Sequence, residues 1–293
     1  LHNIEAPPHT LPSSPDSSLL CGLMRERIII SLSILIFFGA ASCSNFRKVE
    51  KSPDWRVKYE AALQYYEEED YYRALVLFEQ ILPIIRGLPE GEKVSFYKAY
   101  CHFYRGEFLL SSHSFKIFHE TYTRSQFAEE AQFMYAYSLY LDSPVYNLDQ
   151  SSSYEAIGAI QTFINRYPSS KFREQASEII NEMQVKLEKK GYENAKQYLK
   201  IGYFKSAIVA FDAFKKDFPD SNYNEEIAFL KIKAEYSLAQ QSVFGKQLER
   251  FRQTRDHYEE FIDDYPNSDY LKEAEKFYTV SLQKISELAK ISR

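Results

Sequence analysis

A helix-ending pattern recurs along the chain and limits the folds open to it. Each copy has a phenylalanine, a second aromatic residue four positions later and, in three of four copies, a proline directly after that. The copies begin at Phe118, Phe163, Phe214 and Phe261, which lie 45, 51 and 47 residues apart. Side chains four apart share one helix face, and proline cannot continue a helix, so each copy predicts a helix end. Repeats of this length indicate stacked supersecondary units.

Small residues recur at fixed places in the predicted helices. Seven residues before the first aromatic residue of most copies there is a small side chain, and each upstream partner helix carries an alanine. Ala74, with Phe78 and Ile81, adds an earlier copy that lacks the proline. We expect these small side chains to let neighbouring helices approach closely. The set is Ala62, Ala74, Ala99, Ser111, Ala136, Ala156, Ala195 and Ala207, with the larger Thr254 as the exception.

These residues resemble the tetratricopeptide repeat, whose short turn carries glycine before an aromatic residue. Gly106-Glu107-Phe108 and Gly202-Tyr203-Phe204 supply that turn, and Ala207, Phe211 and Pro219 follow at the family's spacing. The first repeat departs from it, with Glu69 where the turn glycine is expected, and the third and fifth repeats carry long insertions. The resemblance covers roughly residues 55–290. It implies an all-α fold, an α-α superhelix of about five helical hairpins with a concave groove.

The first 43 residues have the layout of a secretory signal. Met24 opens a segment with two arginines, an apolar run from Ile28 to Phe38, and small residues that lead into Cys43. The apolar run is shorter than the roughly 20 residues that a membrane-spanning helix needs. The small residues before Cys43 resemble the bacterial lipobox, which implies an acylated (palmitate-bearing) N-terminal cysteine and anchoring to a membrane. A secreted protein cut near Ala41, with a free thiol, is the alternative.

We therefore divide the chain into four segments. Residues 1–23 precede a credible start methionine and are expected to be a mis-annotated extension, and 24–42 are the lipoprotein signal peptide. Residues 43–53 form the acylated N-terminus and linker, and 54–290 form the tetratricopeptide-repeat domain.

Composition and motifs exclude several classes of function. A net charge of −5 gives no broad positive field for nucleic acid. The three cysteines, at positions 21, 43 and 101, form no paired framework and no C-x-x-C site. The sequence has no H-E-x-x-H motif, no glycine-rich phosphate loop and no G-x-S-x-G elbow. We expect a protein-binding chain with no catalytic residues, no metal and no cofactor.

The lipobox and the repeated helix ends together are similar to the outer-membrane barrel-assembly lipoprotein family, BamD or YfiO. The similarity includes the turns Tyr167-Pro168-Ser169-Ser170, Phe218-Pro219-Asp220-Ser221 and Tyr265-Pro266-Asn267-Ser268. It implies a lipid-anchored protein on the periplasmic face of the outer membrane. Its implied partners are the periplasmic domains of the barrel insertase BamA and unfolded outer-membrane β-barrel proteins.

Two sets of residues are candidates for these contacts. A ring-lined groove on the first helices would bind an extended segment of an unfolded barrel protein, although such rings more often pack between helices. Basic residues of repeats four and five could pair with carboxylates on BamA, or form only a solvated helix face. The groove set is Tyr59, Leu63, Tyr66, Phe96, Tyr100, Phe103, Phe133, Tyr137 and Tyr140. The basic set is Lys215, Lys216, Arg250, Arg252 and Arg255.

Two other classes of binding protein stay open. One is a periplasmic tetratricopeptide scaffold of the Tol-Pal type, which usually follows a coiled coil and lacks a lipobox. The other is a glycan-binding lipoprotein with a helical-repeat body, which is generally longer. The proteins that co-purify with the chain would separate these alternatives.

Overall fold

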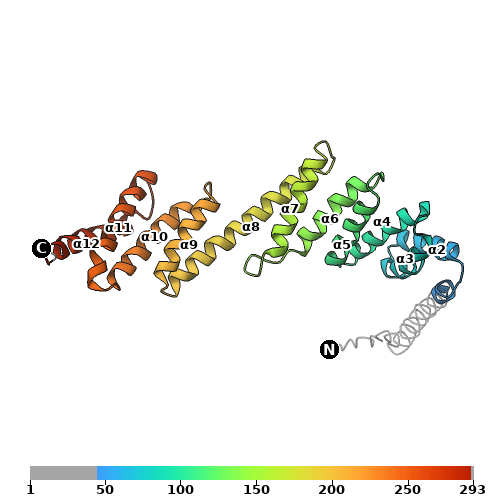
Figure 1. Cartoon of the computed structure of the whole chain (residues 1–293), viewed down its shortest axis with the longest axis horizontal. Coiled ribbons are helices and arrows are strands. Elements are labelled where there is room, and N and C mark those ends of the chain that lie inside the picture. Colours follow the sequence, from blue (N-terminus) through green and yellow to red (C-terminus); the bar gives the residue numbers. More distant parts are fainter. Residues whose placement is uncertain (1–44, 292–293) are drawn as a thin grey trace, which may run out of the picture. The chain divides into compact units, whose positions relative to one another are not determined.

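The computed structural model describes residues 45–291, and every regular element in that range is a helix (Figure 1). The chain divides after Gly106 into two compact units. We call residues 45–106 unit 1 and residues 107–291 unit 2, and each is described by itself. Cys43 and the predicted signal peptide lie outside the described residues.

Unit 1 holds a short helix at residues 45–50 followed by three longer helices. These are α2 (Trp55–Glu67), α3 (Tyr71–Ile85) and α4 (Pro89–Tyr104). α3 packs against both α2 and α4, and its side chains Phe78 and Ile81 are fully buried. The short helix adds Phe46 and Val49 to the same core. The chain is therefore packed against the core of unit 1 from residue 46 onward.

Unit 2 is a series of antiparallel helices in which each helix packs against the next. The helices are α5 (Phe108–Thr121), α6 (Ala128–Asp142), α7 (Ser151–Arg166), α8 (Arg173–Lys200), α9 (Phe204–Asp217), α10 (Asn224–Gln240), α11 (Phe244–Asp264) and α12 (Leu271–Ile291). Contacts join every consecutive pair, and α10 also contacts α8 and α12. The predicted all-α fold of tetratricopeptide-like helical hairpins is thus confirmed for the described residues.

The predicted helix ends are confirmed at all four copies of the aromatic pattern. α5, α7, α9 and α11 each end one residue before the second aromatic residue of the copy. The backbone N–H of that residue donates to the carbonyl oxygen of the first phenylalanine, at 2.8 or 2.9 Å. The donors are Tyr122, Tyr167, Phe218 and Tyr265. This bond closes the last helical turn, and the following proline, where present, prevents another.

The turn after each helix end also positions the next helix. In the turn after α7, the Ser170 hydroxyl accepts the N–H of Phe172 at 3.1 Å, and the Phe172 ring stacks on Phe133 of α6 at 4.5 Å. The turns after α9 and α11 repeat the arrangement, with Tyr223 on Tyr192 at 4.0 Å and Tyr270 on Phe229 at 4.8 Å. We call these three stacks the turn-ring contacts. The turns after α7, α9 and α11 are thus joined to α6, α8 and α10, respectively.

The small residues lie where the sequence predicts close helix packing. All nine, including Thr254, are at most 1% exposed. Ser111 of α5 and Ser138 of α6 are both buried, and their hydroxyls hydrogen bond at 3.0 Å. Larger side chains at these positions would displace the neighbouring helix.

The extra length of the third repeat is the loop of residues 143–150 between α6 and α7, and the long helix α8 that follows supports this loop. α8 has 28 residues, whereas α9 has 14. Its middle section supports the α6–α7 loop, because Lys190 donates to the Leu148 carbonyl at 2.6 Å and Lys186 to the Ser143 hydroxyl at 2.5 Å. The insertion is therefore held in place by side chains of the next repeat's first helix.

Glu69 adopts the backbone conformation of the turn glycine that it replaces. Its φ is 61°, close to the 73° of Gly106 and the 80° of Gly202 at the matching turns. A side chain in this left-handed region costs about 1–2 kcal/mol because its Cβ approaches the backbone. The first repeat thus keeps the turn geometry of the others at a cost in stability.

We predict that Glu69→Gly raises the free energy of unfolding by up to about 1 kcal/mol, since the relieved strain is partly offset by the entropy of glycine. Chemical denaturation measures the change. The matched control is Gly202→Glu, which should lower the free energy of unfolding by about 1 kcal/mol. A Cβ at position 202 meets no atom within 4 Å, so that variant reports backbone conformation alone. A loss of stability in Glu69→Gly would contradict the account.

Candidate protein-interaction site

The groove residues of unit 1 form a cluster of packed rings. Phe96 is buried at 4% exposure, and Tyr100 lies edge-on to it at 5.1 Å. Tyr66 of α2 packs on Tyr97 of α4 at 4.6 Å, and burial raises the pKa of Tyr66. The other members, Tyr59, Leu63 and Phe103, are half-buried. The cluster therefore joins α2 to α4 and leaves only partial ring surfaces open.

The groove residues of unit 2 form a ladder of rings along α6. Phe133 is 2% exposed and stacks on Phe172 on one side and on Tyr137 on the other, at 5.7 Å. Tyr137 in turn stacks on Tyr140 at 5.9 Å. The Tyr140 hydroxyl donates to the carboxylate of Glu182 on α8, which raises the pKa of Tyr140 to about 12. The rings of this ladder therefore use part of their surface in packing against one another.

These positions divide the predicted groove set into two kinds of residue. Phe96 and Phe133 are buried, so they support the surface from beneath. The remaining seven are half-buried and present part of a side chain to solvent. Contact with a bound segment therefore stays a proposal for those seven alone.

The basic residues of the second candidate set lie on two helices and differ in their partners. Lys215 pairs with Asp264 at 3.4 Å, and Arg255 pairs with the adjacent Asp256 at 2.8 Å. Arg250 donates to the Ser242 hydroxyl. Lys216 of α9 and Arg252 of α11 are exposed to solvent. These last two are the members best placed to meet a partner.

A charge network centred on a buried carboxylate links α9, α10 and α11, and no pattern in the sequence indicates it. Glu235 of α10 is 5% exposed and lies 2.6 Å from His257 Nδ1 of α11. Lys231 lies 3.0 Å from His257 Nε2 and pairs with Asp212 of α9 at 2.7 Å. The hydrogen bond to Glu235 raises the pKa of His257, while Lys231 opposes the shift; burial raises the pKa of Glu235. The network binds three helices together.

A second network joins α8 to α10. Tyr192 donates to Glu226 at 2.6 Å, and Lys196 donates to the same carboxylate at 2.8 Å. Burial opposes the ionisation of Glu226, but the hydrogen bonds from Lys196 and Tyr192 together outweigh burial and lower its pKa. The Tyr192 ring is also part of a turn-ring contact. Polar and aromatic contacts thus fix the same point of α8.

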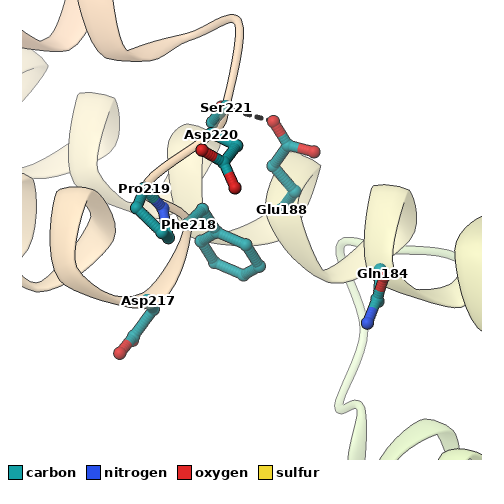
Figure 2. Close-up of a pocket in the computed structure, with 7 residues that line it drawn as sticks. All are labelled: Gln184, Glu188, Asp217, Phe218, Pro219, Asp220 and Ser221. Carbon is teal, nitrogen blue, oxygen red and sulfur yellow. Dashed lines mark hydrogen bonds between the residues drawn. The ribbon is translucent and has the colours of Figure 1, made fainter.

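A shallow pocket of about 300 Å³ lies where the turn after α9 meets α8. Figure 2 shows the hydrogen bond from the Ser221 hydroxyl to Glu188, with Phe218 and Pro219 beside it. Asp217 and Asp220 add two more carboxylates to the lining. Among residues 45–291, no group of three or more metal-ligating side chains could hold an ion. The pocket is therefore a feature of the helix-ending turn and does not form a metal centre.

The helices of the described part define the class of the protein. They are helical hairpins joined by packed turns, with charged and aromatic side chains on their outer faces. No helix within residues 45–291 is long and apolar enough to cross a membrane. This is a helical-repeat scaffold of the tetratricopeptide kind.

Comparison with known proteins identifies the family. The family model described as "YfiO: Outer membrane lipoprotein" matches residues 53–247 and 192–285. The chain belongs to the YfiO family of outer membrane lipoproteins, and the resemblance expected from the sequence is confirmed. No curated protein matches the chain.

Solved structures also match, among them two related chains. Both are Podosopora anserina chains described as a putative kinesin light chain with nearly identical TPR-like repeats, and one of them carries a single substitution. The substituted form is 12% identical, with a TM-score of 0.32, and the match covers 73% of this chain and 96% of that one. The other is 12% identical, with a TM-score of 0.31, and the match covers 69% and 93%. Both scores are low, and the fold assignment depends on the helices themselves.

We predict that the stability contributed by His257 falls as pH rises. A histidine with a raised folded-state pKa contributes its full stabilisation below its ordinary pKa of about 6.5 and loses it as pH rises through the folded value. The difference in unfolding free energy between wild type and His257→Gln should therefore shrink with rising pH. Denaturation at a series of pH values measures it. His113→Gln, at an exposed position of α5, is the control, and a pH-independent difference at His257 would contradict the prediction.

Proposed function

We propose that this chain is a lipid-anchored component of the outer-membrane β-barrel assembly machinery, on the periplasmic face of the membrane. In this role it binds the insertase BamA and unfolded outer-membrane proteins, promotes their folding and insertion, and catalyses no reaction. The observation that carries the proposal is the family match over residues 53–285.

The anchor that we propose is an acyl group on Cys43. The helix at residues 45–50 begins two residues after Cys43, and its Phe46 packs edge-on against Tyr65 of α2 at 5.7 Å. Arg73 of α3 lies over the Phe46 ring at 5.6 Å. An acyl chain at residue 43 would thus be attached to unit 1 through a very short segment. That geometry favours holding unit 1 close to the bilayer surface.

For the client site, we propose the partly open rings of each unit. In unit 1 they are Tyr59, Tyr66, Tyr100 and Phe103, with Leu63, and in unit 2 they are Tyr137 and Tyr140. Aromatic side chains give large apolar contact area at low entropic cost, and extended segments of barrel proteins carry alternating apolar side chains. Phe96 and Phe133 hold these rings in place from the core.

We predict that Tyr100→Ser together with Tyr137→Ser weakens binding of a barrel-derived peptide by roughly thirtyfold, at about 1 kcal/mol per ring. Fluorescence anisotropy of a labelled peptide measures the affinity, and circular dichroism should show unchanged helical content. Tyr154→Ser is the control, because Tyr154 is 63% exposed on α7 and outside the proposed site. Unchanged peptide affinity in the double variant would show that the rings serve packing alone. Phe96→Ser should instead lower stability, by about 3 kcal/mol or more.

For BamA contact, we propose the basic residues Lys215, Lys216, Arg250, Arg252 and Arg255 of α9 and α11. Reversing Lys216 and Arg252 disturbs no ion pair among the described residues. We predict that Lys216→Glu with Arg252→Glu lowers the recovery of purified BamA periplasmic domains in a pull-down, and more so at low salt. Lys51→Glu, at an exposed position of unit 1, is the control. Full recovery with the double variant at low salt would remove these residues from the proposed interface.

A further inference from the structure

Two neighbouring turns of unit 2 expose large apolar side chains. In the turn between α8 and α9, Ile201 is 49% and Tyr203 is 63% exposed. Between α10 and α11, Val243 is 72% and Phe244 is 56% exposed. The two turns lie at the same ends of the parallel helices α8 and α10, along the lower side of unit 2 in Figure 1. We call these four residues the apolar edge.

The opposite ends of the same helices differ in character. The turns at 167–172, 218–223 and 265–270 each contain proline and serine, and the last two also contain aspartate. Their aromatic side chains are half-buried by the turn-ring contacts and by the preceding helices, and none of the large apolar residues at these described positions is exposed. Of these two sets of turns, only the set with Ile201, Tyr203, Val243 and Phe244 therefore exposes large apolar side chains.

A cavity of about 430 Å³ opens beside the apolar edge, between α9, α10 and α11. Four lysine and arginine side chains line it: Lys205 from the first turn of α9, Lys246 and Arg250 from the first two turns of α11, and Lys231 of α10, which is paired with Asp212. Ile208, Val209 and Leu238 give the cavity apolar walls.

The carboxylates of the same cavity are mostly matched within the protein. Asp212 is paired with Lys231, and Glu235 hydrogen bonds to His257. Glu249 is exposed at the rim. The side chains of Lys205 and Lys246 take part in no ion pair or hydrogen bond found among the described residues. Their charges therefore face the cavity and the solvent.

We propose that the apolar edge and this cavity together form a docking site for an anionic phospholipid surface. The phosphate of a headgroup is held by Lys205 and Lys246, and Ile201, Tyr203, Val243 and Phe244 enter the interfacial layer. Apolar and aromatic side chains prefer this layer when cations lie next to them, because the cations are attracted to anionic headgroups. The inference depends on the membrane location in the proposed function, but on no contact with BamA.

The shape and charge of the site favour a lipid surface over a protein groove. The apolar side chains project from two turns and do not line a trough, which suits insertion into a soft layer. The cations lie immediately behind them, as complementarity to an anionic surface requires. A protein interface on this edge is the competing outcome of the test.

The test uses tryptophan as a depth probe in the full chain. The chain has one tryptophan, Trp55, so Trp55→Phe gives a background in which Phe244→Trp is the sole probe. Asp220→Trp, on the opposite edge, is the matched control. Each protein is added to vesicles of phosphatidylethanolamine and phosphatidylglycerol with brominated acyl chains. An anchor at residue 43 holds both variants to the vesicle alike, so the readout is depth at the probe and not binding.

We expect emission from position 244 to shift to shorter wavelength and to be quenched, while emission from position 220 is unchanged. Lys205→Glu with Lys246→Glu should raise the amount of anionic lipid needed for half-quenching by roughly tenfold or more. Equal responses at 244 and 220, or no effect of the charge reversal, would overturn the proposal. So would a probe at 244 that responds to BamA periplasmic domains and not to vesicles. An unquenched probe in a chain that still binds BamA would refute this inference and leave the proposed function intact.

Discussion

The turn-ring contacts are the interaction on which the order of unit 2 depends. In each of these contacts, an aromatic residue of a turn stacks on an aromatic residue two elements back in the chain. Tyr223, in the turn after α9, stacks on Tyr192 of α8 at 4.0 Å. The turn serine fixes the backbone of that ring, and Ser221 also bonds to Glu188 of α8. Since every hairpin buries its face only against neighbours, these contacts decide where each surface residue lies. The candidate sites of unit 2 all derive their geometry from this repeated unit.

Much of the fold could be predicted because its signals are local. Phe214, Phe218 and Pro219 mark a helix end by sequence alone, and Ala207 marks a close contact. The unbroken length of α8 was not predicted, because Gly191 lies within it and glycine usually weakens a helix. The structure shows its use: a Cβ at position 191 would lie 3.1 Å from the Phe214 ring, so glycine lets that ring pack closely against α8.

The candidate sites were less accessible to sequence reasoning, because they depend on which helix faces which. The buried Glu235–His257 pair joins residues 22 apart on two helices, and no spacing in the sequence indicates it. Phe133 was predicted to line a groove, yet it is stacked between Phe172 and Tyr137. The sequence did hold a sign of this stacking. A glutamate lies four residues before each of two rings that receive a turn-ring contact: Glu129 before Phe133 and Glu188 before Tyr192. Exposure of the apolar edge has no sequence signal, because Val243 and Phe244 resemble core residues.

Family membership and a stack of helical hairpins together support our proposal that this chain is a membrane-held binding partner of the barrel insertase. The most direct test is mass spectrometry of the proteins that co-purify with the full-length chain from detergent-solubilised membranes. We expect BamA in the purified material and an acyl group on Cys43 of the purified chain. Recovery of Tol components or of a glycan transporter in place of BamA, or an unmodified cysteine, would contradict the proposal.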